Sequence, residues 1–121
     1  MDKDSKILIV GAGPVGLTLH HFLKKEGFLR VRHIDKSLTI AQESRAIGIH
    51  SFTLEVILKQ LGLTEEFKQR GNVIQRLQFE EKGEILVNID LPRFICSIPQ
   101  NITEEILNRG IEVQRGIECV Y

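Results

Sequence analysis

The sequence predicts an α/β fold, in which a Rossmann-like parallel sheet carries an inserted antiparallel β-hairpin. Three observations support this prediction. An unbroken apolar run at residues 7–10 leads into a glycine triplet, Gly11, Gly13 and Gly16. The next strand-like segment ends at Asp35, 19 residues after the last glycine. From residue 73 onward, apolar and polar residues alternate, which is typical of antiparallel strands with one exposed face.

The glycine triplet has the spacing of a dinucleotide-binding loop. Glycine there allows a tight turn, a close approach of the backbone to a pyrophosphate, and close contact between the next helix and the sheet. Helix N–H groups then face the phosphates, and Pro14 is tolerated in the first turn because it needs no donor there. Asp35 is placed to accept ribose hydroxyls. A purely structural turn is the alternative, but the order of strand, glycine turn and helix favours phosphate binding.

The opening elements follow from apolar spacing. Lys6–Val10 has no alternation, so we expect a strand buried on both faces of a parallel sheet. A helix should begin at Pro14 and end before Gly27. Phe28–Asp35 is predicted as the second strand, with one face poorly covered because it carries arginine and histidine. Residues 36–50 show no clean period and are predicted as loop.

Two short helices and a hairpin are expected next. Ser51 is a candidate N-cap for a helix that Gly62 ends, and Thr64 is a candidate cap for another. The alternating residues 73–89 predict a hairpin that turns at Glu81-Lys82-Gly83. Its pattern implies one exposed face, which a doubly wound sheet does not have.

The last part of the chain is predicted to return to the parallel sheet. Asn101 and Glu104 have the spacing of a capped helix start, and Gly110 ends that helix after barely two turns. Ile111–Val113 and Ile117–Tyr121 are strand-like. An exposed edge strand and a half-covered core would promote self-association.

Composition excludes several classes of function. The 121 residues suit one domain or slightly more, and 16 basic residues balance 16 acidic ones, so nothing favours nucleic acid or an anionic membrane. The start, MDKDSK, lacks the character of a signal peptide, and we expect a cytoplasmic protein. Cys96 and Cys119 are expected to be buried free thiols. No histidine spacing suits a metal, and no nucleophile motif is present, so we assign no catalytic residue.

Three blocks of residues occur in order along nearly the whole chain: Gly11-Ala12-Gly13-Pro14-Val15-Gly16-Leu17 with Asp35; Ser44-Arg45-Ala46-Ile47-Gly48-Ile49-His50 with Thr53-Leu54-Glu55 and Gln60-Leu61-Gly62-Leu63; and Pro99-Gln100 with Thr103-Glu104 and Leu107. Together they resemble the FAD-dependent aromatic-ring monooxygenases, the group that includes p-hydroxybenzoate, phenol and pentachlorophenol hydroxylases. The first block alone would suit either FAD or a nicotinamide dinucleotide. The other two are more particular, and their resemblance favours FAD.

The resemblance implies a role for each block. The first would bind the ADP part of FAD, Arg45 would reach the flavin, and Gln100 would contact the ribityl chain; a loop arginine and a helix-capping glutamine are the alternatives. Lys36 is a candidate contact for the adenosine end, with a solvated lysine as the alternative. The complete enzyme would use NAD(P)H and oxygen to hydroxylate an aromatic or similar planar molecule. Ile111–Gln114 would return as a third strand beside the second.

The resemblance also implies a division of the chain. Residues 1–71 would form the FAD-binding βαβ core with a helical segment, residues 72–99 a hairpin in the substrate-covering layer, and residues 100–121 the return helix and third strand. His20 stands where the family has a small residue, and Phe52 where it usually has arginine. About one helical turn between Leu107 and Gly110 and the later Asp-Gly and Gly-Asp-Ala-Ala-His-like motifs are absent, so the fold is incomplete relative to the family.

Two further hypotheses stand beside an FAD-binding N-terminal part of a monooxygenase. The chain could be a truncated, non-catalytic dinucleotide-binding module, which the missing motifs favour. It could also be a fragment of an NAD-binding reductase, which the block at residues 44–63 disfavours.

Overall fold

The computed structural model describes residues 1–42 and 45–120. The chain forms two compact units, one made of Met1–Arg45 and Gln100–Tyr121 and the other of Ala46–Pro99. Ser44, which begins the second block of the family resemblance, and Tyr121, which ends the last strand-like segment, lie outside the described residues. We call the first unit the parallel-sheet unit and the second the antiparallel unit.

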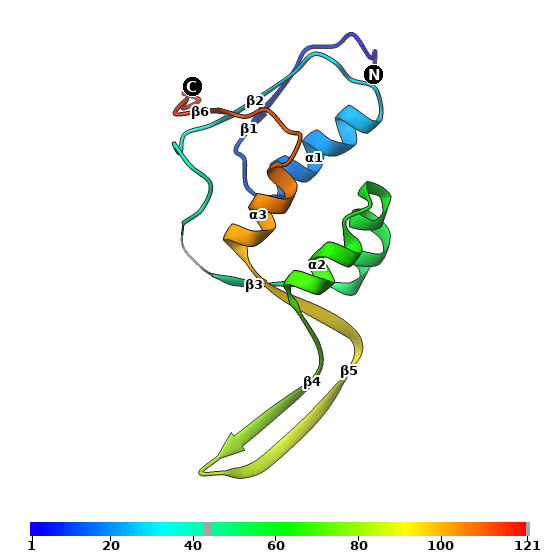
Figure 1. Cartoon of the computed structure of the whole chain (residues 1–121), viewed down its shortest axis with the longest axis vertical. Coiled ribbons are helices and arrows are strands. Elements are labelled where there is room, and N and C mark those ends of the chain that lie inside the picture. The colour runs from blue at the N-terminus through cyan, green and yellow to red at the C-terminus, as the bar shows by residue number, and fades with distance from the viewer. Residues whose placement is uncertain (43–44, 121) are drawn as a thin grey trace. The chain divides into compact units, whose positions relative to one another are not determined.

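The parallel-sheet unit contains the predicted strand, glycine turn, helix and strand. Strands β1 (Ile7–Val10), β2 (Val31–Asp35) and β6 (Gln114–Arg115) pair in parallel in the order β1-β2-β6. Helix α1 (Pro14–Lys25) begins at its proline and connects β1 to β2, as Figure 1 shows. Strand β2 starts three residues later than Phe28, whose N–H donates to the carbonyl oxygen of Leu23 at the end of α1.

One face of this sheet is more open than the sequence predicts. Leu8 and Val10 of β1 are 53% and 57% exposed, so the expectation of a strand buried on both faces is wrong. Side chains alternate across a strand, and Ile9 points to the opposite, buried face. Arg32 of β2 is exposed, in agreement with the poorly covered face predicted for that strand.

Helix α3 (Gln100–Asn108) packs along α1. The Nε2 atom of His21 donates to the carbonyl oxygen of Leu107 at 2.6 Å, and Lys24 Nζ donates to the carbonyl oxygen of Gly110 at 2.9 Å. These two bonds add polar ties to an apolar helix contact. The short helix is as predicted, but its start is not: the helix already includes Gln100, so Asn101 lies inside it and does not cap it.

The return strand is shorter than predicted. Among the described residues that follow α3, 109–120, Gln114–Arg115 pairs with β2, opposite Ile34 and Asp35, whereas 111–113 and 117–120 form no strand. The N–H of Ile111 donates to the carbonyl oxygen of Asn108, so the turn after α3 uses a group that a strand would pair. The side chain of Ile111 is buried without a sheet partner.

The antiparallel unit is a three-stranded sheet in the order β3-β5-β4, formed by β3 (Ala46–His50), β4 (Asn72–Glu81) and β5 (Glu84–Pro99). The predicted hairpin is confirmed, and it turns at Lys82 and Gly83, whose φ angles are 51° and 85°. Figure 1 shows β4 and β5 as a long paired ribbon. Its second strand is longer than expected and extends to Pro99.

The prediction of loop for all of residues 36–50 is wrong at Ala46–His50. This strand is too short to show a clear period, and its pairing partner lies some fifty residues later in the chain, with Ala46 opposite Pro99 and His50 opposite Ile95. Gly48 lies opposite Ser97, and a Cβ there would be 3.1 Å from the side chain of Ile95. Distant pairing, rather than local pattern, therefore forms the strand.

Residues 51–70 are helical, but not as one α-helix. A π-helical turn (Thr53–Ile57) and a 3-10 turn (Leu58–Leu61) precede α2 (Thr64–Arg70). Ser51 is already helical and makes no N-cap. Thr64 is the first residue of α2, and its hydroxyl donates to the carbonyl oxygen of Leu54 instead of capping the helix. The buried core of this segment consists of Leu54, Leu58 and Phe67.

The two cysteines differ in environment. Cys96 is fully buried, and burial raises the pKa of its thiol, an effect that Lys68 opposes. Cys119 is exposed, so the expectation of burial is wrong for it.

Within residues 1–42 and 45–120, no group of three or more histidine, cysteine or acidic residues could hold a metal ion. In the same residues, no helix has the length and apolar character needed to cross a membrane.

Candidate functional site

The glycine loop between β1 and α1 is shaped by contacts that only glycine allows and leaves space at the start of the helix. Gly11 has a φ of 100°, which favours glycine, and its N–H donates to the carbonyl oxygen of Ile34. A Cβ at Gly16 would overlap the carbonyl oxygen of Gly11, so the helix can approach the loop only because this residue is glycine. A Cβ at Gly13 would meet nothing within 4 Å. Open space therefore lies at the N-terminus of α1, where an anion is stabilised.

Asp35 sits at the end of β2 and braces this loop. Its Oδ2 accepts a hydrogen bond from the N–H of Ala12 at 2.6 Å, and its Oδ1 accepts one from the N–H of Ser37 at 2.7 Å. Burial acts to raise the pKa of Asp35, but these two N–H donors, together with the charge of Arg115, outweigh it and hold the pKa below its ordinary value. The carboxylate is thus charged at neutral pH and has further lone pairs with which to accept hydroxyl groups.

A cavity of about 1020 Å³ in the parallel-sheet unit extends from the glycine loop across Asp35. Its lining includes residues that the sequence singled out from three distant places. The backbone N–H of Gln100 donates to the carbonyl oxygen of Arg45 at 2.7 Å, which holds these two positions side by side. The cavity is lined by Gly13, Asp35, Lys36, Ser37, Thr39, Ile40, Ala41, Gln42, Arg45, Gln100, Glu104 and Arg115.

Gly11, Pro14 and Gly16 do not line this cavity, although the sequence names them as cofactor-binding candidates. Gly11 and Gly16 shape the loop through the close contact described above. Pro14 occupies the first turn of α1, where its missing N–H leaves no donor unpaired. We interpret all three as residues that form the phosphate-binding loop, in contrast to Gly13, which faces the cavity.

Two charged residues of the cavity are absent from the sequence-based list of site residues. Glu104 of α3 is 5% exposed, and burial raises the pKa of its carboxyl, while hydrogen bonds from Gln100 and the N–H of Ala41 and the charge of Arg115 oppose the rise. Arg115 lies on β6, opposite Asp35 in the sheet, and its guanidinium is 3.4 Å from Oδ1 of Asn108.

A signal for Glu104 is present in the sequence. It falls on the apolar face of α3, beside the buried Ile106 and Leu107. Burying a charged carboxylate there costs free energy unless the group is paired or hydrogen-bonded. Arg115 gives no such signal, because its nearness to Asp35 depends on the two residues of β6 pairing with β2.

The lining suits a dinucleotide cofactor. A helix N-terminus with open space at Gly13 accommodates a pyrophosphate, and Asp35 offers an acceptor for ribose hydroxyls. Lys36, Arg45 and Arg115 supply positive charge around the same cavity. The residues of the cavity can bind and orient such a cofactor, whereas the redox chemistry would be that of the cofactor itself.

Comparison with known proteins agrees with this geometry. A family described as "FAD binding domain" matches residues 4–119 of the chain. The 6-methylpretetramide 4-monooxygenase of Streptomyces rimosus is 36% identical over 93% of this chain and 22% of its own length. The rifampicin monooxygenase of Rhodococcus hoagii is 32% identical over 96% of this chain and 26% of its own length.

Solved structures share the fold. The flavin-dependent monooxygenase PieE, in complex with FAD and substrate, superimposes with a TM-score of 0.78 at 21% identity, over 92% of this chain and 23% of that chain. The oxygenase MHPCO, described as acting on 2-methyl-3-hydroxypyridine-5-carboxylic acid, gives a TM-score of 0.78 at 18% identity over 95% of this chain and 32% of its own. The chain spans about a quarter of the length of the curated relatives named above, 22% and 26%.

Proposed function

This chain belongs to the family of FAD binding domains, and from that premise we propose that it forms the FAD-binding N-terminal part of a flavin-dependent monooxygenase. One observation carries the proposal. Gly13, Asp35, Arg45 and Gln100 come from separate parts of the sequence and line one cavity within the parallel-sheet unit. In this proposal, Gly13 lies at the phosphates, Asp35 at the ribose, and Arg45 and Gln100 at the larger ring system.

We assign each candidate residue a role in this proposal. The loop of Gly11, Gly13, Pro14 and Gly16 binds the pyrophosphate, and Asp35 accepts the ribose hydroxyls. Lys36 contacts the adenosine end, while Arg45 and Gln100 contact the flavin end. None of these residues exchanges a proton with the substrate.

The proposed reaction of the complete protein is the hydroxylation of an aromatic or similar planar molecule with NAD(P)H and oxygen. The relatives support this class, since their names include monooxygenases of 6-methylpretetramide and rifampicin and a hydroxylase of 3-(3-hydroxy-phenyl)propionate. When FAD is bound it supplies the oxygen chemistry, and this chain positions it. Because both cofactors are intracellular metabolites, we propose a cytoplasmic location.

A binding experiment tests the assignment of FAD. The purified chain is titrated into FAD at pH 7.5, and flavin fluorescence and the visible spectrum are recorded, with NAD as the competing ligand. We expect saturable FAD binding with a shifted flavin spectrum, and no displacement by NAD. If NAD binds and protects the fold against heat while FAD does neither, the chain is a nicotinamide-binding module and our assignment is wrong.

The division of labour within the chain is part of the proposal. Residues 1–71 and 100–121 would hold the cofactor core, and residues 72–99 would contribute to the layer that covers the substrate. Apolar side chains on the hairpin support this role, since Phe79, Ile85 and Val87 are all about half exposed. Such side chains suit contact with a planar apolar molecule or with further protein.

A non-catalytic module is the second candidate, favoured by the open face of β1. Leu8 and Val10 are exposed there, and an apolar edge strand promotes self-association. Sedimentation of the chain at several concentrations measures the association, and Leu8→Lys should reduce it. Oxidation of NADPH by the chain with FAD and a phenol would contradict a non-catalytic role, whereas FAD binding without oxidation would support it.

A further inference from the structure

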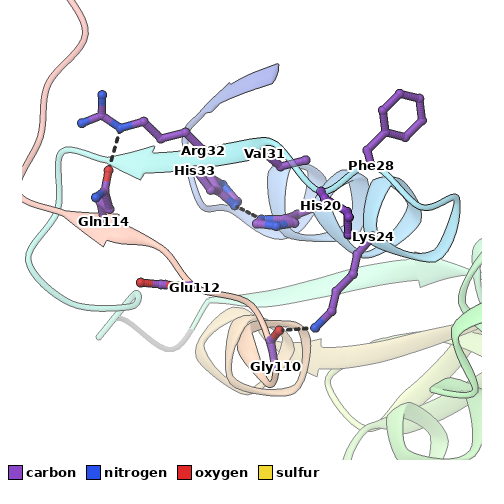
Figure 2. A pocket seen from close by; sticks show the side chains of 10 residues that line it. His20, Lys24, Phe28, Val31, Arg32, His33, Gly110, Glu112 and Gln114 are labelled. Atoms are coloured by element: carbon purple, nitrogen blue, oxygen red, sulfur yellow. Dashed lines mark hydrogen bonds between the residues drawn. The ribbon is translucent and has the colours of Figure 1, made fainter. Parts of the chain in front are cut away.

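Two buried histidines lie directly beneath the glycine loop. His20 of α1 and His33 of β2 place their Nδ1 atoms 3.1 Å apart, and Nε2 of His33 lies 2.9 Å from the carbonyl oxygen of Gly11. Figure 2 shows the two rings joined between the helix and the strand. His20 is 9% exposed and His33 is 2% exposed. A pair of ionisable rings is therefore connected to the loop that faces the cofactor cavity.

The acceptor at one end fixes where the protons lie. A carbonyl oxygen only accepts, so Nε2 of His33 must carry a proton and donate it to Gly11. In its neutral form His33 then has a bare Nδ1, which needs a donor. His20 supplies that donor through its own Nδ1–H. The hydrogen bonds therefore run in one direction, from His20 to His33 to Gly11.

The backbone of Gly11 links the histidine pair to the glycine loop. Its N–H donates to the carbonyl oxygen of Ile34 at 2.8 Å, and its carbonyl oxygen lies against the bare Cα of Gly16. On the other side of the loop, the N–H of Ala12 donates to Asp35. The orientation of the Gly11 peptide thus determines how the following backbone N–H groups present themselves at the start of α1.

We propose that His33, held in place by His20, is a positioning residue for the dinucleotide cofactor, because it fixes the Gly11 peptide and with it the phosphate-facing loop. This proposal rests on the proposed function, because it requires that the protein binds a dinucleotide. The hydrogen bonds from His20 to His33 and from His33 to Gly11 do not depend on that function.

The pair responds to protons in a defined way. One extra proton leaves an N–H between the two Nδ1 atoms, but a second sets two N–H groups against each other across 3.1 Å, and the rings must separate. Burial lowers the pKa of His20, and His33, His21 and Lys24 lower it further. Arg32 of β2 and Glu112 of the segment after α3 line the same cavity as the pair. Glu112 is the acidic residue among these basic ones. Lowering the pH should therefore weaken the hydrogen bond from His33 to Gly11.

Three variants test the inference. The dissociation constant for FAD is measured by flavin fluorescence for the wild-type chain, His33→Phe and His33→Gln. Phenylalanine keeps a planar ring but leaves the part-buried Gly11 carbonyl without a donor, so we expect binding about tenfold weaker at pH 7.5. Glutamine can donate from its Nε2, so it should recover the wild-type affinity at that pH. His21→Gln is the matched control, because His21 donates to Leu107 and not to the loop.

The pH profile separates positioning from general support of the fold. As the pH is lowered from 7.5, the wild-type chain and His21→Gln should bind FAD progressively more weakly. His33→Gln presents no ring N–H that could oppose the Nδ1–H of His20, so its affinity should stay flat over the same range of pH. A sloping profile for His33→Gln, or wild-type affinity in a folded His33→Phe, would overturn the proposal. If His33→Phe does not fold by circular dichroism, the profile of His33→Gln decides.

A nitrogen-15 NMR spectrum of the histidine rings keeps the two proposals apart. If the wild-type chain binds no FAD, the proposed function fails, and the ring spectrum still tests the inference. A proton on Nε2 of His33 supports the inference. So does an amide signal of Ala12 that shifts less on acidification in His33→Gln than in the wild type. A proton on Nδ1 of His33 in place of Nε2 overturns it.

Discussion

Gly13 and Gly16 belong to one motif but serve different purposes. A Cβ at Gly16 would overlap the carbonyl oxygen of Gly11 and lie 3.3 Å from Nε2 of His33, so this glycine is required by the fold itself. A Cβ at Gly13 meets no protein atom within 4 Å, and its φ of −77° suits any residue. The space beside Gly13 is therefore available to a ligand.

This difference predicts opposite behaviour of two variants. Gly13→Val should abolish FAD binding, because the side chain blocks the approach of the pyrophosphate, while costing no more stability than the loss of a glycine N-cap. Gly16→Ala should lower the free energy of unfolding by about 1–3 kcal/mol or more, as overpacking does. Urea denaturation and FAD titration of both variants check this. Unaltered FAD binding by Gly13→Val would show that the phosphates lie elsewhere.

Arg45 and Lys36 line the same cavity but are assigned to opposite ends of the cofactor. Arg45→Ala should weaken binding of FAD more than that of ADP, because ADP lacks the flavin that Arg45 is expected to reach. Lys36→Ala serves as the control and should weaken both ligands alike. Competition titrations with the two ligands measure the ratio. Equal losses of FAD and ADP binding in Arg45→Ala would remove Arg45 from the flavin end.

At the scale of elements, local pattern predicts the structure where the cause is local. The helix at Pro14–Lys25 and the hairpin turn at Lys82 and Gly83 follow from a proline, an apolar stripe and residues that adopt positive φ. Strand β3 and the short β6 depend on partners far along the chain, and no local signal specifies them. The capping predictions failed for another reason: the Thr64 hydroxyl is committed to Leu54, a contact between two helical segments.

The junction of α2 and β4 is tightly packed around Gly71. A Cβ there would lie 2.7 Å from Sγ of Cys96, 2.9 Å from the carbonyl oxygen of Ser97 and 3.0 Å from that of Phe67. Two of these atoms are backbone and cannot move aside. Gly71→Ala should therefore destabilise the antiparallel unit by about 1–3 kcal/mol. Gln75→Ala, at an exposed position of β4, is the control; equal urea midpoints for the two variants would contradict the predicted overlap.

At the scale of the whole molecule, the sequence predicts which residues line the cavity better than it predicts the residues that support them. The glycine spacing and Asp35 predict a phosphate and ribose site, and the structure brings Gly13 and Asp35 to one cavity. The contact of His20 with His33 depends on how α1 crosses β2, and sequence alone shows only a histidine where a small residue is usual and a polar second strand. Arg115 likewise joins the cavity only through strand pairing.

The dependence of stability on pH should show two steps. The lowered pKa of His20 means that the unfolded chain takes up a proton first, so stability falls as the pH drops below about 6.5. The lowered pKa of Asp35 stabilises the fold above about pH 3.9, and that contribution is lost in stronger acid. The raised pKa of Glu104 acts in the opposite sense, since its protonation relieves a buried charge.

Urea unfolding between pH 8 and 3 measures these steps. His20→Leu should remove the slope between about pH 6.5 and 5, and Glu104→Gln should raise stability at neutral pH while leaving that slope in place. A wild-type slope retained in His20→Leu would assign the upper step to another group.

The hydrogen bond between the N–H of Gln100 and the carbonyl oxygen of Arg45 also has a consequence for how the chain could be engineered. The backbone leaves the parallel-sheet unit at Arg45 and re-enters it at Gln100, 2.7 Å away across one hydrogen bond. The segment between these two residues is Ala46–Pro99, the antiparallel unit, and its two ends lie side by side. A tight turn could bridge the same gap, so we expect the parallel-sheet unit to keep its fold when such a turn replaces residues 46–99.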